Sequence, residues 1–258
     1  MSMLDVAHLT KHFGGVRALD DVTFSVASGE VVGLIGPNGA GKTTCFNVIA
    51  GALKPTSGTV KFAGTDVTGW SADRISRLGV ARTFQNIAMF PELTVWDNVY
   101  AAAVTRMKAG YLQCVLGLPW ARAEARTLES VVWDTLALVG LAEEADTVSS
   151  QLPYGYQRRL EIARALATRP RLILLDEPVA GMNASETADI MALIRKLRSE
   201  HTVLVIEHDM SLVMGVCDRV IVLDNGKKIA DGEPDTVQRD ERVIQAYLGG
   251  DIDAELIA

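Results

Sequence analysis

Cysteine is scarce in this chain, which has only three in 258 residues. Cys45, Cys114 and Cys217 are odd in number and widely spaced, so they offer neither a disulfide framework nor a zinc pattern. A reducing cytosol suits such a sequence. Cys45 follows a glycine-rich loop directly. We expect it to be a small buried apolar residue, with a redox role as the alternative.

Long apolar runs and dense basic clusters are also missing. Without an apolar run of about 18 residues, the chain itself is not expected to cross a membrane. Residues 1–5 lack the basic and apolar regions of a signal peptide, so export by that route is not expected. The formal net charge is −7, which disfavours nucleic acid as the main partner. The hydrophobic fraction of 48% and the charged fraction of 22% are ordinary for a globular domain, with room for a subdomain.

The strongest motif is a glycine-rich loop whose first eight residues fit G-x-x-x-x-G-K-[ST]. An apolar segment over 31–35 predicts a buried strand before it, and 43–50 predicts a helix after it, which is the context this motif requires. Its backbone N–H groups and the helix N-terminus can hold phosphate oxygens. Lys42 can reach the β- and γ-phosphates of a nucleotide, and the Thr43 hydroxyl can ligate Mg²⁺. The predicted phosphate-binding residues are Gly36, Pro37, Asn38, Gly39, Ala40, Gly41, Lys42, Thr43 and Thr44.

The hydrophobic pattern alternates between predicted strands and helices. Strands are expected at 3–8, 20–27, 30–35, 58–63, 80–84, 172–175, 203–206, 220–223 and 228–230. A turn-like segment at 11–15 separates the first two, and Asn225-Gly226 predicts a hairpin. Helices are expected between 94 and 148, over 155–167, and after Asn183, an N-cap with Glu186 three residues on. Apolar residues recur at helical spacing in the first region (Leu128, Val131, Val132, Thr135, Leu136 and Val139) and form a stripe in the last (Ile190, Leu193, Ile194 and Leu197). This order predicts an α/β fold with a largely parallel sheet, antiparallel strands near the N-terminus and an inserted helical subdomain.

Several polar residues follow the predicted buried strands. Asp176 and Glu177 end the strand at 172–175, where the carboxyl edge of a sheet lies beside the phosphate loop. We assign Asp176 to the Mg²⁺ shell, through water, and Glu177 to polarising the attacking water. His208 follows the strand at 203–206 and is a candidate γ-phosphate contact. Gln85 ends the strand at 80–84, and its amide can bridge metal and water.

Taken in order, these motifs resemble those of ATP-binding cassette (ABC) proteins. The resemblance rests on 36–43, Gln85, the run 152–159, 172–177 and His208, and covers nearly the whole chain. It implies a P-loop NTPase with a RecA-like core (1–93 and 160–258) and a helical subdomain (94–159). It further implies Mg²⁺-dependent ATP hydrolysis by a head-to-tail dimer. Phe13 falls where the family has an aromatic that stacks on adenine, the alternative being a core phenylalanine.

The family's signature loop is altered here, since Leu152-Pro153-Tyr154-Gly155-Tyr156-Gln157 replaces the common Leu-Ser-Gly-Gly-Gln. Pro153 has neither a hydroxyl nor an N–H group, so the trans nucleotide contact that the resemblance implies would rely on the N–H groups of Tyr154, Gly155 and Tyr156. By resemblance, Tyr154, Gly155, Tyr156 and Gln157 form this trans contact.

The strings at 81–86, 154–155, 180–183, 206–210 and 246–249 resemble the ATPase subunits of branched-chain amino-acid importers. That subfamily implies two transmembrane permease subunits, a second ATPase subunit and, indirectly, an extracytoplasmic solute-binding protein. The implied location is the cytoplasmic face of the cell membrane. Relatives with similar motifs serve urea, short amides or other amino acids, so those cargoes are alternatives. The apolar stretch 110–120 is either packed inside or a docking surface.

Two other classes of ABC protein are less consistent with this chain. Soluble ABC ATPases of DNA repair or translation tend to carry two cassettes or a long coiled-coil insertion, whereas one phosphate loop and a short insertion are present here. A non-catalytic nucleotide-binding regulator would be expected to lack the base, and Glu177 is present.

Overall fold

The computed structural model describes residues 2–83, 88–107, 113, 116 and 118–248. The chain forms two compact units, Met1–Arg82 with Arg171–Ala258, and Thr83–Pro170. The helical unit extends beyond the expected limits of 94–159 at both ends. At the later boundary the reason is local, because α6 (Tyr154–Ala167) is one continuous helix and a boundary at 159/160 would cut it in the middle.

The first unit opens with an antiparallel sheet in the order β2-β1-β4-β5. Its strands are β1 (Ser2–Phe13), β2 (Val16–Ala27), β4 (Ser57–Phe62) and β5 (Thr65–Asp66). The turn-like segment expected over 11–15 is wrong in extent, because β1 continues to Phe13, which pairs with Val16. Only Gly14 and Gly15 form the turn, and Gly14 takes the φ of +56° that such a tight reversal requires.

A second sheet of the same unit has the order β10-β9-β3-β8-β7-β6. Its strands are β3 (Val31–Ile35), β6 (Val80–Arg82), β7 (Leu172–Asp176), β8 (Thr202–Ile206), β9 (Arg219–Asp224) and β10 (Lys227–Gly232). All neighbours are parallel except β9 and β10, which form the expected hairpin at Asn225-Gly226. Every residue of β3, β7 and β8 is buried, as continuous apolar strands predict for a sheet covered on both faces.

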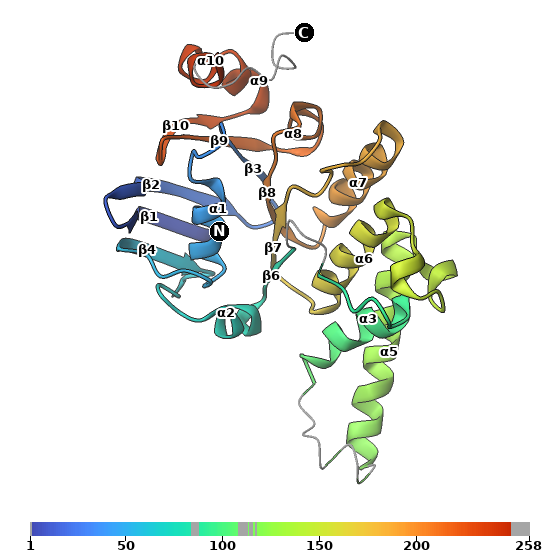
Figure 1. Ribbon diagram of the computed structural model, residues 1–258. Coiled ribbons are helices and arrows are strands. Elements are labelled where there is room, and N and C mark those ends of the chain that lie inside the picture. The colour runs from blue at the N-terminus through green and yellow to red at the C-terminus, as the bar shows by residue number, and fades with distance from the viewer. Residues whose placement is uncertain (1, 84–87, 108–112, 114–115, 117, 249–258) are drawn as a thin grey trace. The chain divides into compact units, whose positions relative to one another are not determined.

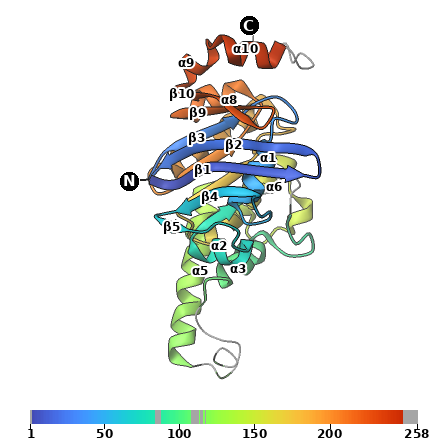
Figure 2. The same ribbon diagram turned by 90° about the vertical axis from the view of Figure 1, so that its left-hand side faces the viewer.

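Helices cover both faces of this second sheet. Figure 1 shows α1 (Lys42–Ile49) between the two sheets, with α7 (Ala184–Leu197) and α8 (Met210–Val216) on the opposite side of the parallel strands. Cys45 and Phe46 of α1 are fully buried in a core shared with both sheets. Short helices complete the unit: α2 (Ala72–Leu78), and α9 (Pro234–Gln238) and α10 (Glu241–Leu248) beyond β10 (Figures 1 and 2). The helices α8, α9 and α10 were not predicted from the hydrophobic pattern.

The helix α7 confirms the predicted start signal. The Asn183 side chain accepts from the N–H groups of Ser185 and Glu186, and Glu186 accepts from the Asn183 N–H. This capping box satisfies backbone donors that a helix otherwise leaves open. The predicted apolar stripe at Ile190, Leu193, Ile194 and Leu197 is buried.

The second unit is helical, as expected. It contains α3 (Val95–Val104), α5 (Pro119–Val139), α6 and two short 3₁₀ turns, η1 (Ala142–Glu144) and η2 (Ser149–Gln151). The residues predicted to recur at helical spacing all lie on the buried face of α5: Leu128, Val131, Val132, Thr135, Leu136 and Val139. Much of the apolar stretch 110–120 lies outside the described residues, while Leu116 and Trp120 are exposed. None of the described helices combines the length and apolar character needed to cross a membrane.

Candidate active site

The glycine-rich loop joins the end of β3 to the start of α1, as its motif predicts. Gly36 has a φ of +146°, and a Cβ added there would lie 2.0 Å from the carbonyl oxygen of Leu223 in β9. Gly41 has a φ of +101°, and its added Cβ would lie 2.4 Å from the Ala18 carbonyl oxygen. Only glycine fits at either position, because the conformation and the close approach each exclude a side chain.

Lys42, the first residue of α1, lies against this loop. Its Nζ donates to the carbonyl oxygens of Gly36 at 2.6 Å and Pro37 at 3.1 Å. Burial lowers the pKa of Lys42, while the negative charges of Glu177 and Asp176 act to raise it. The loop lysine and the two predicted acidic residues are therefore close enough to interact electrostatically.

Asp176 is the last residue of β7 and is almost fully buried. Its Oδ2 accepts from Nη2 of Arg82 at 2.9 Å, and Nη1 of Arg82 donates to Oδ1 of Asn47 at 2.6 Å. This chain of contacts links β7 to α1 through the end of β6. Neither Arg82 nor Asn47 was predicted as a site residue from the sequence, because only the ladder between β6 and β7 brings Arg82 to the carboxylate.

Glu177 and His208 lie at the ends of neighbouring parallel strands, and the structure brings them together. Nδ1 of His208 is 3.8 Å from Oε1 of Glu177. Glu177 has a φ of +48°, which lies in the left-handed region and is unfavourable for a residue with a side chain. Its N–H donates to the carbonyl oxygen of Ile206 at 3.0 Å, so β8 holds the strained residue in place. The two side chains remain accessible, at 23% exposure for Glu177 and 59% for His208.

Glu207 lies between this histidine and β8, and it is a functional candidate that the sequence analysis missed. Its side chain is 0% exposed. Oε1 accepts from the Val179 N–H at 3.2 Å, while Oε2 accepts from the N–H groups of His208 at 3.0 Å and Asp209 at 3.3 Å. Burial raises the pKa of Glu207, and the three N–H donors together with His208 oppose that rise. A charged residue directly after a four-residue apolar strand was the available signal.

The remaining residues predicted to bind the metal or the nucleotide lie on different elements of the fold. Thr43 and Thr44 lie in the first turn of α1. Gln85 lies outside the described residues. Phe13 is 47% exposed at the end of β1, which contradicts the alternative of a core phenylalanine. Lys11 Nζ lies 5.0 Å from the centroid of its ring.

The signature residues open α6 in the helical unit. Gly155 lies in the first turn, as expected, with Pro153 as N-cap. The Tyr156 N–H donates to the Pro153 carbonyl oxygen at 3.0 Å, so one of the three predicted donors already has a partner. The Tyr154 hydroxyl accepts from Nε of Arg158 at 3.2 Å, and Nε2 of Gln157 donates to the Leu152 carbonyl oxygen at 2.9 Å. These contacts tie the first turn of the helix to its own neighbouring residues.

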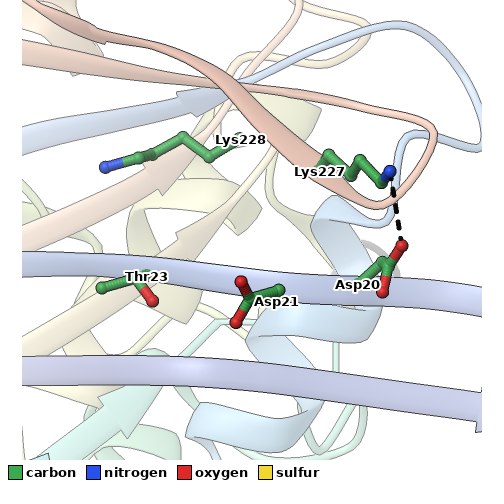
Figure 3. Close-up of a pocket in the computed structure, with 5 residues that line it drawn as sticks. All are labelled: Asp20, Asp21, Thr23, Lys227 and Lys228. Atoms are coloured by element: carbon green, nitrogen blue, oxygen red, sulfur yellow. Dashed lines mark ion pairs between the residues drawn. The ribbon is translucent and has the colours of Figure 1, made fainter.

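A surface pocket of about 440 Å³ opens between β2 and β10 (Figure 3). It is lined by Asp20, Asp21, Thr23, Lys227 and Lys228. Its charged groups are already paired, with Lys227 on Asp20 at 3.5 Å, Lys228 on Asp231 at 2.8 Å and Asp21 on His8 at 2.7 Å. None of the predicted site residues lines it, so we assign it no part in catalysis.

The sheet order, the glycine loop and the acidic residues at the strand ends define a P-loop nucleotide-binding protein. A family model described as "ABC transporter" matches residues 19–180. A second, described as "Branched-chain amino acid ATP-binding cassette transporter", matches residues 227–253. The chain belongs to the ABC transporter family, in which it is an ATP-binding subunit that hydrolyses ATP.

Curated relatives match almost the whole chain. The high-affinity branched-chain amino acid transport ATP-binding protein BraF of Pseudomonas aeruginosa is 45% identical over 249 residues, which is 96% of this chain and 98% of that protein. The corresponding protein LivG of Escherichia coli is 43% identical over 251 residues, with the same coverage. The lipopolysaccharide export system ATP-binding protein LptB of Haemophilus influenzae is 34% identical over 250 residues, covering 96% and 98%.

Solved structures confirm the fold. An ATP-binding cassette of an ABC transporter in its ADP conformation superposes with a TM-score of 0.85 at 33% identity, covering 97% of this chain and 100% of that chain. A dimeric cassette in a post-hydrolysis state, bound to ADP and Pi, matches with a TM-score of 0.75 at 26% identity, covering 90% and 99%. Dimeric cassettes of this family are therefore known.

Proposed function

We propose that this chain is the ATPase subunit of an importer for branched-chain amino acids. The main support for this substrate is the match of residues 227–253 to the branched-chain cassette model, together with the 45% identity to BraF. Identity to the lipopolysaccharide exporter subunit is lower, at 34%. ATP hydrolysis is therefore common to relatives with different substrates, while the assignment of the transported substrate depends on the C-terminal match and the more similar relatives.

In the proposed reaction, Glu177 accepts a proton from water as the water oxygen attacks the γ-phosphorus and ADP leaves. His208, 3.8 Å from Glu177, contacts the γ-phosphate oxygens. Lys42 and the loop N–H groups hold the β- and γ-phosphates, and Phe13 offers an exposed ring to adenine. The strand-end geometry supports this division of roles, because the base and the histidine lie close together on the loops that follow β7 and β8.

Mg²⁺ fits the donor set of the site. The Thr43 hydroxyl and the Asp176 carboxylate are hard oxygen donors, and Gln85 is a further candidate by sequence. No group of three or more His, Cys, Asp or Glu side chains among the described residues could hold a metal alone. This ion usually has only a few protein ligands, and water and phosphate oxygens complete its coordination shell. When bound, Mg²⁺ would neutralise charge on the β- and γ-phosphates.

The proposed assembly has two such subunits head to tail, each presenting residues 154–157 to the nucleotide held by the other. The start of α6 can supply N–H groups to that phosphate. Two transmembrane permease subunits would carry the motion, and an extracytoplasmic binding protein would deliver the cargo. The chain would then work at the cytoplasmic face of the membrane.

Uptake of labelled leucine tests both parts of the proposal. Cells lacking this gene, complemented with wild type or Glu177→Gln, should take up leucine only with the wild-type copy. Purified Glu177→Gln should bind ATP and not turn it over. Normal leucine uptake without the wild-type copy, while purified wild type hydrolyses ATP, would retain the ATPase and reject this cargo. Urea, amides and other amino acids would then be screened.

A further inference from the structure

Two loops that the proposed mechanism treats separately share one buried side chain. The loop after β7 carries Glu177, and the loop after β8 carries His208. The Glu207 carboxylate accepts hydrogen bonds from both loops, from the N–H group of Val179 on the first and from those of His208 and Asp209 on the second. Each carboxylate oxygen serves a different loop.

We propose that Glu207 is a positioning residue that joins the Glu177 loop and the His208 loop into one rigid unit. The proposal rests on the assignment of Glu177 and His208 as reacting groups. Glu207 itself is fully covered and lies 3.9 Å from Nδ1 of His208, so it acts through its neighbours and does not touch the nucleotide.

Rigidity matters here because the Glu177 backbone is strained. A φ of +48° persists only where surrounding contacts hold it, and two of these contacts tie the loop to β8 and the residue after it. Glu177 donates to the Ile206 carbonyl oxygen, and Val179, two residues on, donates to Glu207. Loss of the second contact would let the loop relax and move the base away from its position beside His208.

The choice of glutamate follows from the donors that surround it. An ionised carboxylate is an acceptor at both oxygens, as three N–H groups on two sides require. Glutamine has nearly the same shape but replaces one oxygen by an NH₂ donor. In Glu207→Gln, either Val179 or the pair His208 and Asp209 must therefore face a donor, so one of the two loops is released.

The test combines amide hydrogen exchange with turnover for Glu207→Gln in the full-length protein. Glu200→Gln is the matched control, since it makes the same change at an exposed site. We expect protection in segments 177–183 and 207–211 to fall about 5- to 100-fold together, as for lost buried hydrogen bonds. ATPase kcat should fall about 10- to 100-fold with the KM for ATP within about 3-fold, as for a misplaced reacting group. Glu200→Gln should match wild type in both.

Unchanged protection of 177–183 in Glu207→Gln would overturn the proposal, and so would a loss confined to 207–211. If Glu207→Gln raises exchange throughout the described core, the whole fold is destabilised and Glu207→Asp takes its place in the test. Aspartate keeps two acceptor oxygens on a shorter side chain. Selective loss in the two segments supports the coupling, and uniform loss overturns it. Glu177→Gln separates the two hypotheses, since full turnover there would refute the proposed base and leave the exchange result standing.

Discussion

The pair between Arg82 and Asp176 allows a quantitative test of how the candidate metal residue is held. Nη2 of Arg82 lies 2.9 Å from Oδ2 of Asp176, with side-chain exposures of 12% and 6%. Removal of one partner from a buried pair costs about 3–5 kcal/mol, because the remaining charge keeps its burial and loses a hydrogen-bonded charged partner. We therefore expect Arg82→Met to lower the free energy of unfolding by about 3–5 kcal/mol. That loss corresponds to roughly 6–20 °C in Tm for a chain of this size.

The matched control is Arg77→Met. Arg77 pairs with Asp73 at 3.2 Å, but both side chains are more than 70% exposed. Water and salt screen such a pair, so the expected cost is below about 1 kcal/mol. Both variants would be unfolded with urea in EDTA and without nucleotide. The double variant Arg82→Met/Asp176→Asn removes both charges, and we expect it to recover most of the stability lost in the single variant.

Two results would refute the reasoning. One is a cost for Arg82→Met no larger than that for Arg77→Met. The other is a double variant that is no more stable than Arg82→Met, since the loss would then come from packing of the arginine stem and not from the carboxylate that lost its arginine partner.

Three further predictions concern the phosphate loop and the helices on either side of the sheet. Gly36→Ala should abolish detectable ATP binding, because its Cβ would lie 2.0 Å from the Leu223 carbonyl oxygen. In the control Gly39→Ala the added Cβ meets open space, so the change should cost only about 1–2 kcal/mol of strain. Equal effects of the two variants in a fluorescent nucleotide titration would contradict this prediction. Cys45 is fully buried with its pKa raised to about 12, so it should resist alkylation at pH 8 in a Cys114→Ser/Cys217→Ser background and react after unfolding; rapid labelling of that native variant would revive a redox role. Because this folded pKa exceeds the ordinary value of 9.0, the contribution of the Cys45 thiol to stability is complete below about pH 9 and falls as the pH rises toward 12, which urea titrations of the same variant across pH would reveal. Asn183→Ala should destabilise α7 by about 1 kcal/mol through loss of the capping box, with Asn183→Ser largely restoring it; an alanine variant as stable as wild type would show that the cap contributes nothing.

Local patterns in the sequence were sufficient for much of the fold. Apolar runs predicted β3, β7 and β8, because strands buried on both faces need no polar alternation. The capping box of α7 and the buried stripe of α5 are confirmed, since both depend on residues three or four apart. The glycine loop was recognisable because its strand and helix neighbours are adjacent in sequence. The short helices α8 and α10 were missed, since each has too few turns to show a period.

Contacts between distant segments required the tertiary structure. Residues 176, 177 and 208 were found as polar residues ending apolar strands, but their neighbours depend on strand order. The pairing of β6 with β7 brings Arg82 to Asp176, across 94 residues of sequence. The pairing of β7 with β8 brings Glu207 beneath the loop of Glu177. Motifs along the chain thus predicted a phosphate loop and the acidic residues that follow the strands, whereas the order of the parallel strands decided which charged groups hold those acidic residues, because side-chain electrostatics acts through space and not along the sequence.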